Sequence, residues 1–282
     1  MSLTLPLTDR LGACLRPLLI SNAAITFSVT WIVAREVAMD SSWTNVAIVL
    51  FPWIGGGAAV VLLILLFGTH VLQSEPGTSK WYDRVWLSWL ALTIYLLHNV
   101  EEYGIDVFGR MTQFPAEICA VLKLPAPPDC PVPASYFLSV NIPAIWVAAP
   151  IAALLSRRHP LVGLAFYGLI FVNLFFHIMP LLAGAGFGPG TLTAIILFVP
   201  VSAWIIHTCF GTGRLSYKAL ALIFFNGVLF HVILTGPLML FINGNIGSAA
   251  LVGTQLANAA LFLLIPWVGE NWRGGVLVTP VT

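Results

Sequence analysis

The sequence contains very few charged residues. Of its 282 residues, 8% are Asp, Glu, Lys or Arg and 59% are hydrophobic, and the mean hydropathy is +0.95. A soluble domain carries roughly 25% charged residues, so this chain lacks the polar groups that would cover a water-facing surface. We therefore expect a polytopic membrane protein, an all-α bundle of transmembrane helices.

Other absences narrow the class of protein further. The net charge is +1, the basic residues are dispersed, and no DNA- or RNA-binding motif is present, so we expect no nucleic-acid partner. There is no internal repeat, low-complexity tract or long polar linker, which favours one integral-membrane domain over residues 1–282. No small-residue cleavage site follows the first apolar run, so we expect that run to remain as a helix.

Long apolar runs are what the sequence has instead. A helix needs about 20 mostly apolar residues to cross the hydrocarbon core. The runs predict seven or eight spans, the first and last being the weakest, at about 18–34, 46–72, 84–103, 134–156, 160–183, 190–210, 216–242 and 248–268.

The basic residues are distributed unequally between the two sides of such a bundle. With eight spans, the side of the N-terminus holds Arg10, Arg16, Lys80, Arg84, Arg157, Arg158, Arg214, Lys218 and Arg273. The other side holds Arg35, Arg110 and Lys123. The positive-inside rule then places both termini in the cytoplasm, in either an ER membrane or a bacterial inner membrane.

The loop 104–133 would therefore face the lumen, periplasm or exterior. It contains two of the four cysteines, Cys119 and Cys130, together with several prolines. Disulfides persist in oxidising compartments. We expect a Cys119–Cys130 disulfide in this loop, the alternative being two free thiols.

Polar residues interrupt three of the predicted helices. His98, Glu101 and Glu102, in HNVEE, are spaced i, i+3 and i+4, so they share a helix face. Asn173 and His177, in NLFFH, are four apart and also share a face. Asn226 and His231, in NGVLFH, are five apart and diverge by about 140° in an ideal helix.

These groups are predicted to lie at one depth. Counted from the cytoplasmic ends of their helices, His98, His177 and His231 rise by about 21, 25 and 21 Å, and Asn141 lies about 10 Å below its outer helix end. In a core about 30 Å thick, all four fall in the outer half. Ionisable residues within a membrane usually mark a functional site; the alternative is hydrogen bonding between helices.

Three functions fit such a cluster. In the first, no cofactor is needed: a protonated glutamic acid starts the cyclisation or isomerisation of an isoprenoid or other lipid, and a histidine moves protons. In the second, the chain is a zinc- or iron-dependent hydrolase, although HNVEE lacks the second histidine of the zincin motifs. In the third, it is a transporter or lipid-binding protein, which the lack of an internal repeat disfavours.

The residues are assigned as follows. Catalysis would use Glu101, Glu102, His98 and His177, and a hydrophobic substrate arriving through the lipid bilayer would be bound or oriented by Asn141, Asn173, Asn226, His231, Tyr103, Asp106 and Arg110. In the metal reading, the ligands would come from His98, Glu101, Glu102, His177 and His231. Because Glu101 and Glu102 are 100° apart on a helix, we expect one of them to face the cavity and the other to brace it.

The three motifs together resemble a family of integral membrane proteins named for an HXXEE motif, in which later Asn-spaced-His motifs follow the first. That resemblance implies a helical membrane protein with a polar, metal-compatible site. The stretches YGIDVFGR and FPAEIC are similar to the fungal meroterpenoid-type membrane-bound terpene cyclases, which implies lyase or isomerase chemistry on an isoprenoid.

Overall fold

The computed structural model describes residues 41–111 and 114–272, so the predicted first span, 18–34, lies outside the described residues. The described part of the chain is helical, with isolated bridges and no strand. Its elements are α2 (Ser41–Gly68), η1 (Lys80–Tyr82), α3 (Arg84–Asn99), η2 (Val100–Gly104), α4 (Phe114–Val121), α5 (Ala134–Asn141), η3 (Ile142–Ala148), α6 (Ala149–Leu155), α7 (Pro160–Leu164), α8 (Phe166–Leu182), α9 (Thr191–Thr193), η4 (Ala194–Phe198), α10 (Val199–Cys209), α11 (Tyr217–Ile242) and α12 (Ser248–Trp272).

Six helices in the described residues are long and apolar enough to cross a membrane. They run over Trp43–Gly68, Ala134–Leu155, Pro160–Leu182, Thr191–Cys209, Tyr217–Ile242 and Ser248–Asn271. Each overlaps one predicted span, so the all-α, multi-pass prediction is confirmed. The total of seven or eight spans, the orientation and the identity of the membrane stay predictions.

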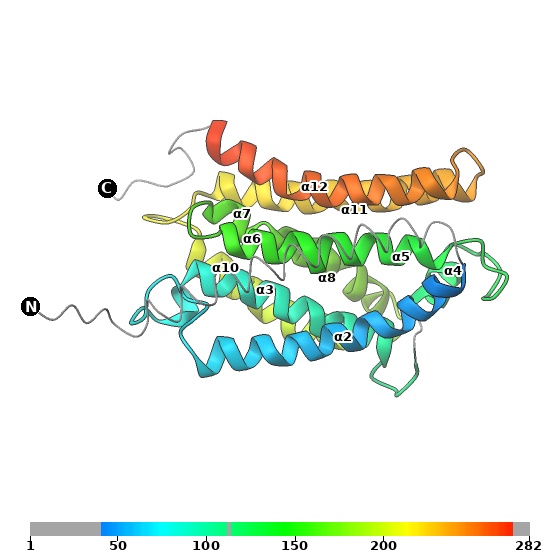
Figure 1. Ribbon diagram of the computed structural model, residues 1–282, viewed down its shortest axis with the longest axis horizontal. Helices are drawn as coiled ribbons and strands as arrows, with labels where there is room; N and C mark the ends of the chain where they lie inside the picture. Colours follow the sequence, from blue (N-terminus) through cyan, green and yellow to red (C-terminus); the bar gives the residue numbers. More distant parts are fainter. Residues whose placement is uncertain (1–40, 112–113, 273–282) are drawn as a thin grey trace, which may run out of the picture.

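The predicted third span, 84–103, forms the central helix of the bundle. It consists of α3 and η2, which follow one another without a break as far as Gly104. Figure 1 shows α11 and α12 side by side along one edge and α2 along the opposite edge, with α3 and α8 between them. Because neighbours pack on several sides of α3, nearly all of its side chains are buried.

A side-chain cap fixes where α3 begins. The Asp83 carboxylate accepts hydrogen bonds from the backbone N–H groups of Val85, at 2.9 Å, and Trp86, at 3.2 Å. A carboxylate at this position satisfies amide donors that have no partner within the helix. The start of the central helix is therefore set by the sequence immediately before it.

The central helix ends in a π-helical turn. The Ile105 N–H donates to the Val100 carbonyl at 2.8 Å, which closes a wide turn over the residues VEEYG. Turns of this kind are rare and are frequent at functional sites. Two further π-helical segments, η3 and η4, occur in the described helices. Glu101 and Glu102 are thus presented by a turn wider than that of a regular helix.

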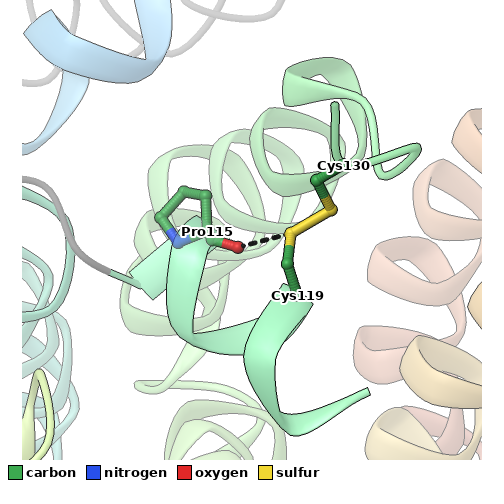
Figure 2. The surroundings of a disulfide bond; sticks show 3 residues. All are labelled: Pro115, Cys119 and Cys130. Atoms are coloured by element: carbon green, nitrogen blue, oxygen red, sulfur yellow. Dashed lines mark hydrogen bonds between the residues drawn. A yellow bond between two sulfur atoms is a disulfide. The ribbon is translucent and has the colours of Figure 1, made fainter. Parts of the chain in front are cut away.

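The loop 104–133 carries the predicted disulfide. Cys119, on α4, is bonded to Cys130, so that prediction is confirmed (Figure 2). The Pro115 carbonyl oxygen lies 3.0 Å from Cys119 Sγ, a contact within α4. The bond ties α4 to the segment that leads into α5, and α4 lies at the same end of the bundle as the start of α5 (Figure 1).

Candidate functional site

Three ligand-bearing side chains converge in the interior. Glu102 places one carboxylate oxygen 3.8 Å from His98 Nε2 and the other 3.5 Å from His177 Nε2. The three ligand atoms lie within 4.8 Å of one another. The residues are 0%, 5% and 7% exposed for His98, Glu102 and His177, so solvent does little to weaken their interaction.

A chain of hydrogen bonds orients His98. Thr193 Oγ1 lies 2.8 Å from His98 Nδ1 and donates its own proton to Glu101 at 2.5 Å. Asn173 Nδ2 lies 3.2 Å from His98 Nε2 and can only donate there. This network assigns the ring proton to Nδ1, which then donates to Thr193, and leaves Nε2 unprotonated, where its lone pair accepts from Asn173. A metal ion bound to Nε2 would replace that hydrogen bond.

Glu101 binds the start of another helix. Its two carboxylate oxygens accept from the backbone N–H groups of Leu192, at 3.0 Å, and Thr193, at 2.6 Å. These residues begin the helix that runs through α9, η4 and α10, and a carboxylate is favourable at a helix N-terminus. Glu101 and Glu102 therefore occupy different surroundings, as expected from their angular separation, while their chemical roles stay predictions.

Gly190 covers the two histidines. Its φ is +79°, and a Cβ atom there would lie 2.6 Å from His98 Cε1 and 2.7 Å from His177 Cε1. Only glycine combines this backbone conformation with so close an approach. The loop before α9 thus rests directly on both imidazole rings.

The three residues fit a metal ion. Two histidines and one carboxylate form a common donor set for catalytic zinc and for non-haem iron, with positions left open. Ligand atoms bound tetrahedrally to zinc are roughly 3.3 Å apart. The distances from the Glu102 oxygens to His98 Nε2, 3.8 Å, and to His177 Nε2, 3.5 Å, are slightly longer. His177 Nε2 is buried and has no hydrogen-bond partner within the described residues, which is costly unless another group binds it.

Tyr103 and Asn141 form a polar contact separate from the cluster of His98, Glu102 and His177. Asn141 Nδ2 donates to Tyr103 Oη at 3.0 Å, and Asn99 Nδ2 donates to Asn141 Oδ1 at 3.2 Å. Tyr103 packs against Phe51 and Phe114. This group joins α3, η2 and α5, and it links the helix that carries HNVEE to the next helix.

Asp106 and Arg110 pair with each other just beyond η2. Arg110 Nη2 lies 2.6 Å from Asp106 Oδ2, and the backbone N–H of Arg110 donates to Asp106 Oδ1 at 2.8 Å. Desolvation raises the pKa of Asp106, but these hydrogen bonds lower it more, and the net pKa lies below its ordinary value. The pair closes the turn that follows the π-helical segment.

The structure does not bring Asn226 or His231 into the three-residue cluster. Asn226 Nδ2 donates to the Phe262 carbonyl on α12 at 2.9 Å. His231 Nδ1 lies 2.8 Å from the Gly227 carbonyl oxygen, and its ring stacks on Phe176 at 5.1 Å. The five-residue spacing explains the divergence, because the two side chains leave α11 in different directions.

Thr193, Gly190 and Glu117 are missed by the sequence reasoning. Thr193 and Gly190 lie at the start of the predicted span 190–210. The adjacent Gly190 and Thr191 suggest the start of a helix, but they do not indicate a functional site. Glu117 is an isolated acid between Pro115 and Cys119 in the loop 104–133. No spacing pattern connects any of the three to HNVEE.

Comparison with known proteins agrees with the first resemblance. A family model described as "Protein of unknown function with HXXEE motif" matches residues 89–205, a stretch that includes HNVEE and NLFFH and ends before NGVLFH. No curated protein and no solved structure matches the chain. The resemblance to terpene cyclases therefore stays a prediction.

Proposed function

We propose that this HXXEE-containing chain is a metal-dependent membrane enzyme of the hydrolase type. His98, Glu102 and His177 would hold a zinc or iron ion, and a hydrophobic substrate would approach from the bilayer. The observation that carries the proposal is the buried, unpartnered Nε2 of His177, 3.5 Å from Glu102. A histidine in that position gains a partner when a cation binds between the two groups.

The surrounding residues supply what a metal ligand needs. Metal-binding histidines usually donate their second ring N–H to an oriented acceptor, and His98 has one in Thr193, which is itself held by Glu101. A bound divalent ion would activate a water molecule or polarise the bond to be cleaved. Glu101 would keep His98 oriented without touching the reacting atoms.

Aromatic side chains pack against the polar cluster. The rings of Tyr95 and Phe198 lie 5.4 and 4.5 Å from that of His98. These aromatic side chains are buried in the core that α3 shares with its neighbours. A lipid or isoprenoid chain that reached the cluster would therefore be next to aromatic rings.

The proposal is tested with purified protein in detergent. We expect the wild-type chain to bind about one equivalent of Zn²⁺ or Co²⁺, and His177→Ala and Glu102→Gln to lose binding by at least about tenfold. His207→Ala removes an exposed histidine on α10 and is the matched control, expected to bind as the wild type does. A wild-type protein that binds neither ion would overturn the metal function.

Acid–base cyclisation or isomerisation is the second candidate, since Glu102 lies between two imidazoles near aromatic rings that could stabilise a carbocation. Turnover of an isoprenoid substrate by chelator-treated protein, lost in Glu102→Gln, would favour it. Loss of turnover on chelation and recovery with Zn²⁺ would favour the metal enzyme.

A further inference from the structure

Glu117 lies outside the long helices that could cross the membrane. It belongs to α4, the short helix in the loop 104–133, and its side chain is half buried. Within residues 41–111 and 114–272, its carboxylate has no hydrogen-bond donor and no cation in salt-bridge contact. A carboxylate held this way keeps its oxygens available to a cation from solution.

One short loop connects Glu117 to the buried cluster. A Cβ atom on Gly188 would lie 2.6 Å from Glu117 Oε1, so the carboxylate rests against that glycine. Two residues later, Gly190 rests against His98 and His177. The segment Gly188–Gly190 thus has the carboxylate of Glu117 against one end and the two imidazoles against the other.

Glu117 also interacts electrostatically with residues of the buried cluster. Burial raises the pKa of Glu117, and the charges that act on this carboxyl are those of His177, Glu102 and Arg110. His177 and Glu102 are two of the three proposed ligands. A half-buried carboxylate near them creates a negative potential on the α4 side of the site, and such potentials speed the association of cations.

We propose that Glu117 is the outer carboxylate that captures a divalent cation from water and delivers it to His98, Glu102 and His177. The inference rests on the proposed metal function. Glu117 is not a ligand in the final site, because its oxygens do not join the group of ligand atoms that lie within 4.8 Å of one another. The disulfide at Cys119, two residues away, holds α4 in place over the site.

The rate of cation uptake tests this role. Metal-free protein is mixed rapidly with Co²⁺, and the absorption of the bound ion is followed in time for the wild type, Glu117→Gln and Glu75→Gln. Glu75 is an exposed acid in the loop between α2 and α3, so its variant has the same change in net charge. We expect Glu117→Gln to slow association about tenfold and Glu75→Gln to leave it unchanged.

Salt and affinity provide independent readouts. Raising the NaCl concentration should slow uptake by the wild type and much less by Glu117→Gln, because salt screens a charge near water. Equal association rates in Glu117→Gln and wild type, with Co²⁺ still bound, would overturn the capture role and leave the metal function standing. A wild type that binds no Co²⁺ would overturn both. Loss of Co²⁺ binding at equilibrium in Glu117→Gln would make Glu117 a ligand and overturn the capture role alone.

Discussion

Glu101 and Glu102 are adjacent in the sequence but bind different parts of the molecule. Glu101 accepts hydrogen bonds from the first residues of the helix that begins at α9, and Glu102 lies between His98 and His177. Two neighbouring carboxylates on one surface would repel each other. Here the amide groups at the helix N-terminus stabilise the charge of Glu101, which leaves Glu102 for the site.

Thr193 offers the sharpest test at the scale of one residue. Thr193→Val keeps the shape of the side chain and removes the hydroxyl that lies between Glu101 and His98. Loss of such an orienting group typically weakens metal binding 10- to 100-fold, and we expect a decrease in Co²⁺ affinity within that range.

Thr193→Ser is the control for that prediction. It retains the hydroxyl, so its affinity should stay close to that of the wild type. Equal Co²⁺ affinity in Thr193→Val and Thr193→Ser would contradict an orienting role for the hydroxyl.

The sequence predicted the polar residues of the HNVEE and NLFFH motifs, including His177 on a second helix, and missed the contacts that come from a loop or a helix start. His98 and Glu102 are four apart, and helical periodicity is enough to place them together. Thr193 reaches His98 across 95 residues of sequence, and no local pattern encodes that contact. Asn226 was expected at the site because it precedes a histidine, but the packing of α11 on α12 directs its amide to Phe262.

At the scale of elements, α8 and α11 cross at two glycines. A Cβ atom on Gly227 would lie 2.0 Å from the carbonyl oxygen of Gly168, and one on Gly168 would lie 2.2 Å from that of Ile223. Small residues let membrane helices approach closely enough for backbone atoms to touch. This crossing sets the position of α8, which carries Asn173 and His177.

We expect Gly227→Ala to destabilise the protein by about 1–3 kcal/mol, because the added methyl group must push α8 and α11 apart. Thermal unfolding in detergent measures the effect. Gly253→Ala on α12 is the control, since a Cβ atom there meets nothing within 4 Å. Its effect should be neutral or stabilising by up to about 1 kcal/mol, because alanine favours helix. Equal melting temperatures for the two variants would contradict this account of the crossing.

The turn after η2 should depend on pH through Asp106. Its pKa is lowered by the hydrogen bonds from Arg110 and Phe108, so the folded state favours the ionised form. The stabilisation is therefore complete above the pKa of an unfolded Asp, about 3.9, and is lost as pH falls through the lower folded value.

Asp106→Asn should cost about 0.2–1 kcal/mol at pH 7, since the Arg110 side chain is 54% exposed and solvent weakens the pair. The difference in melting temperature from wild type should shrink below about pH 4. Asp129→Asn, an exposed change in the same loop, should show neither effect. A difference from the wild type that stayed constant down to pH 2 would contradict the assignment.

At the scale of the whole molecule, composition was enough to predict the class of fold. The six described helices that could cross a membrane all coincide with apolar runs. The disulfide was predictable because two cysteines share one loop. The π-helical turns were not, because their residues differ little in type from those of ordinary membrane helices.

The basic residues also predict how the bundle is oriented in the membrane. The excess of basic residues predicts that the loop 104–133 faces away from the cytoplasm. Val107→Cys, an exposed position in that loop, should react with a membrane-impermeant maleimide on intact cells. Arg158→Cys, exposed at the turn between α6 and α7, should react only after the membrane is permeabilised. The reverse pattern would invert the proposed topology.

The hydrogen bonds of Glu101 and His98 also mean that the HNVEE motif would not form this site in another protein by itself. The same five residues grafted into an unrelated membrane helix would bring a glutamate with no helix start to bind and a histidine ring free to rotate. They would also lack the imidazole that faces Glu102 from α8. A search for this string alone should therefore return many sequences that lack the site, whereas a Thr at a helix start and a His on a third helix would distinguish those that have it.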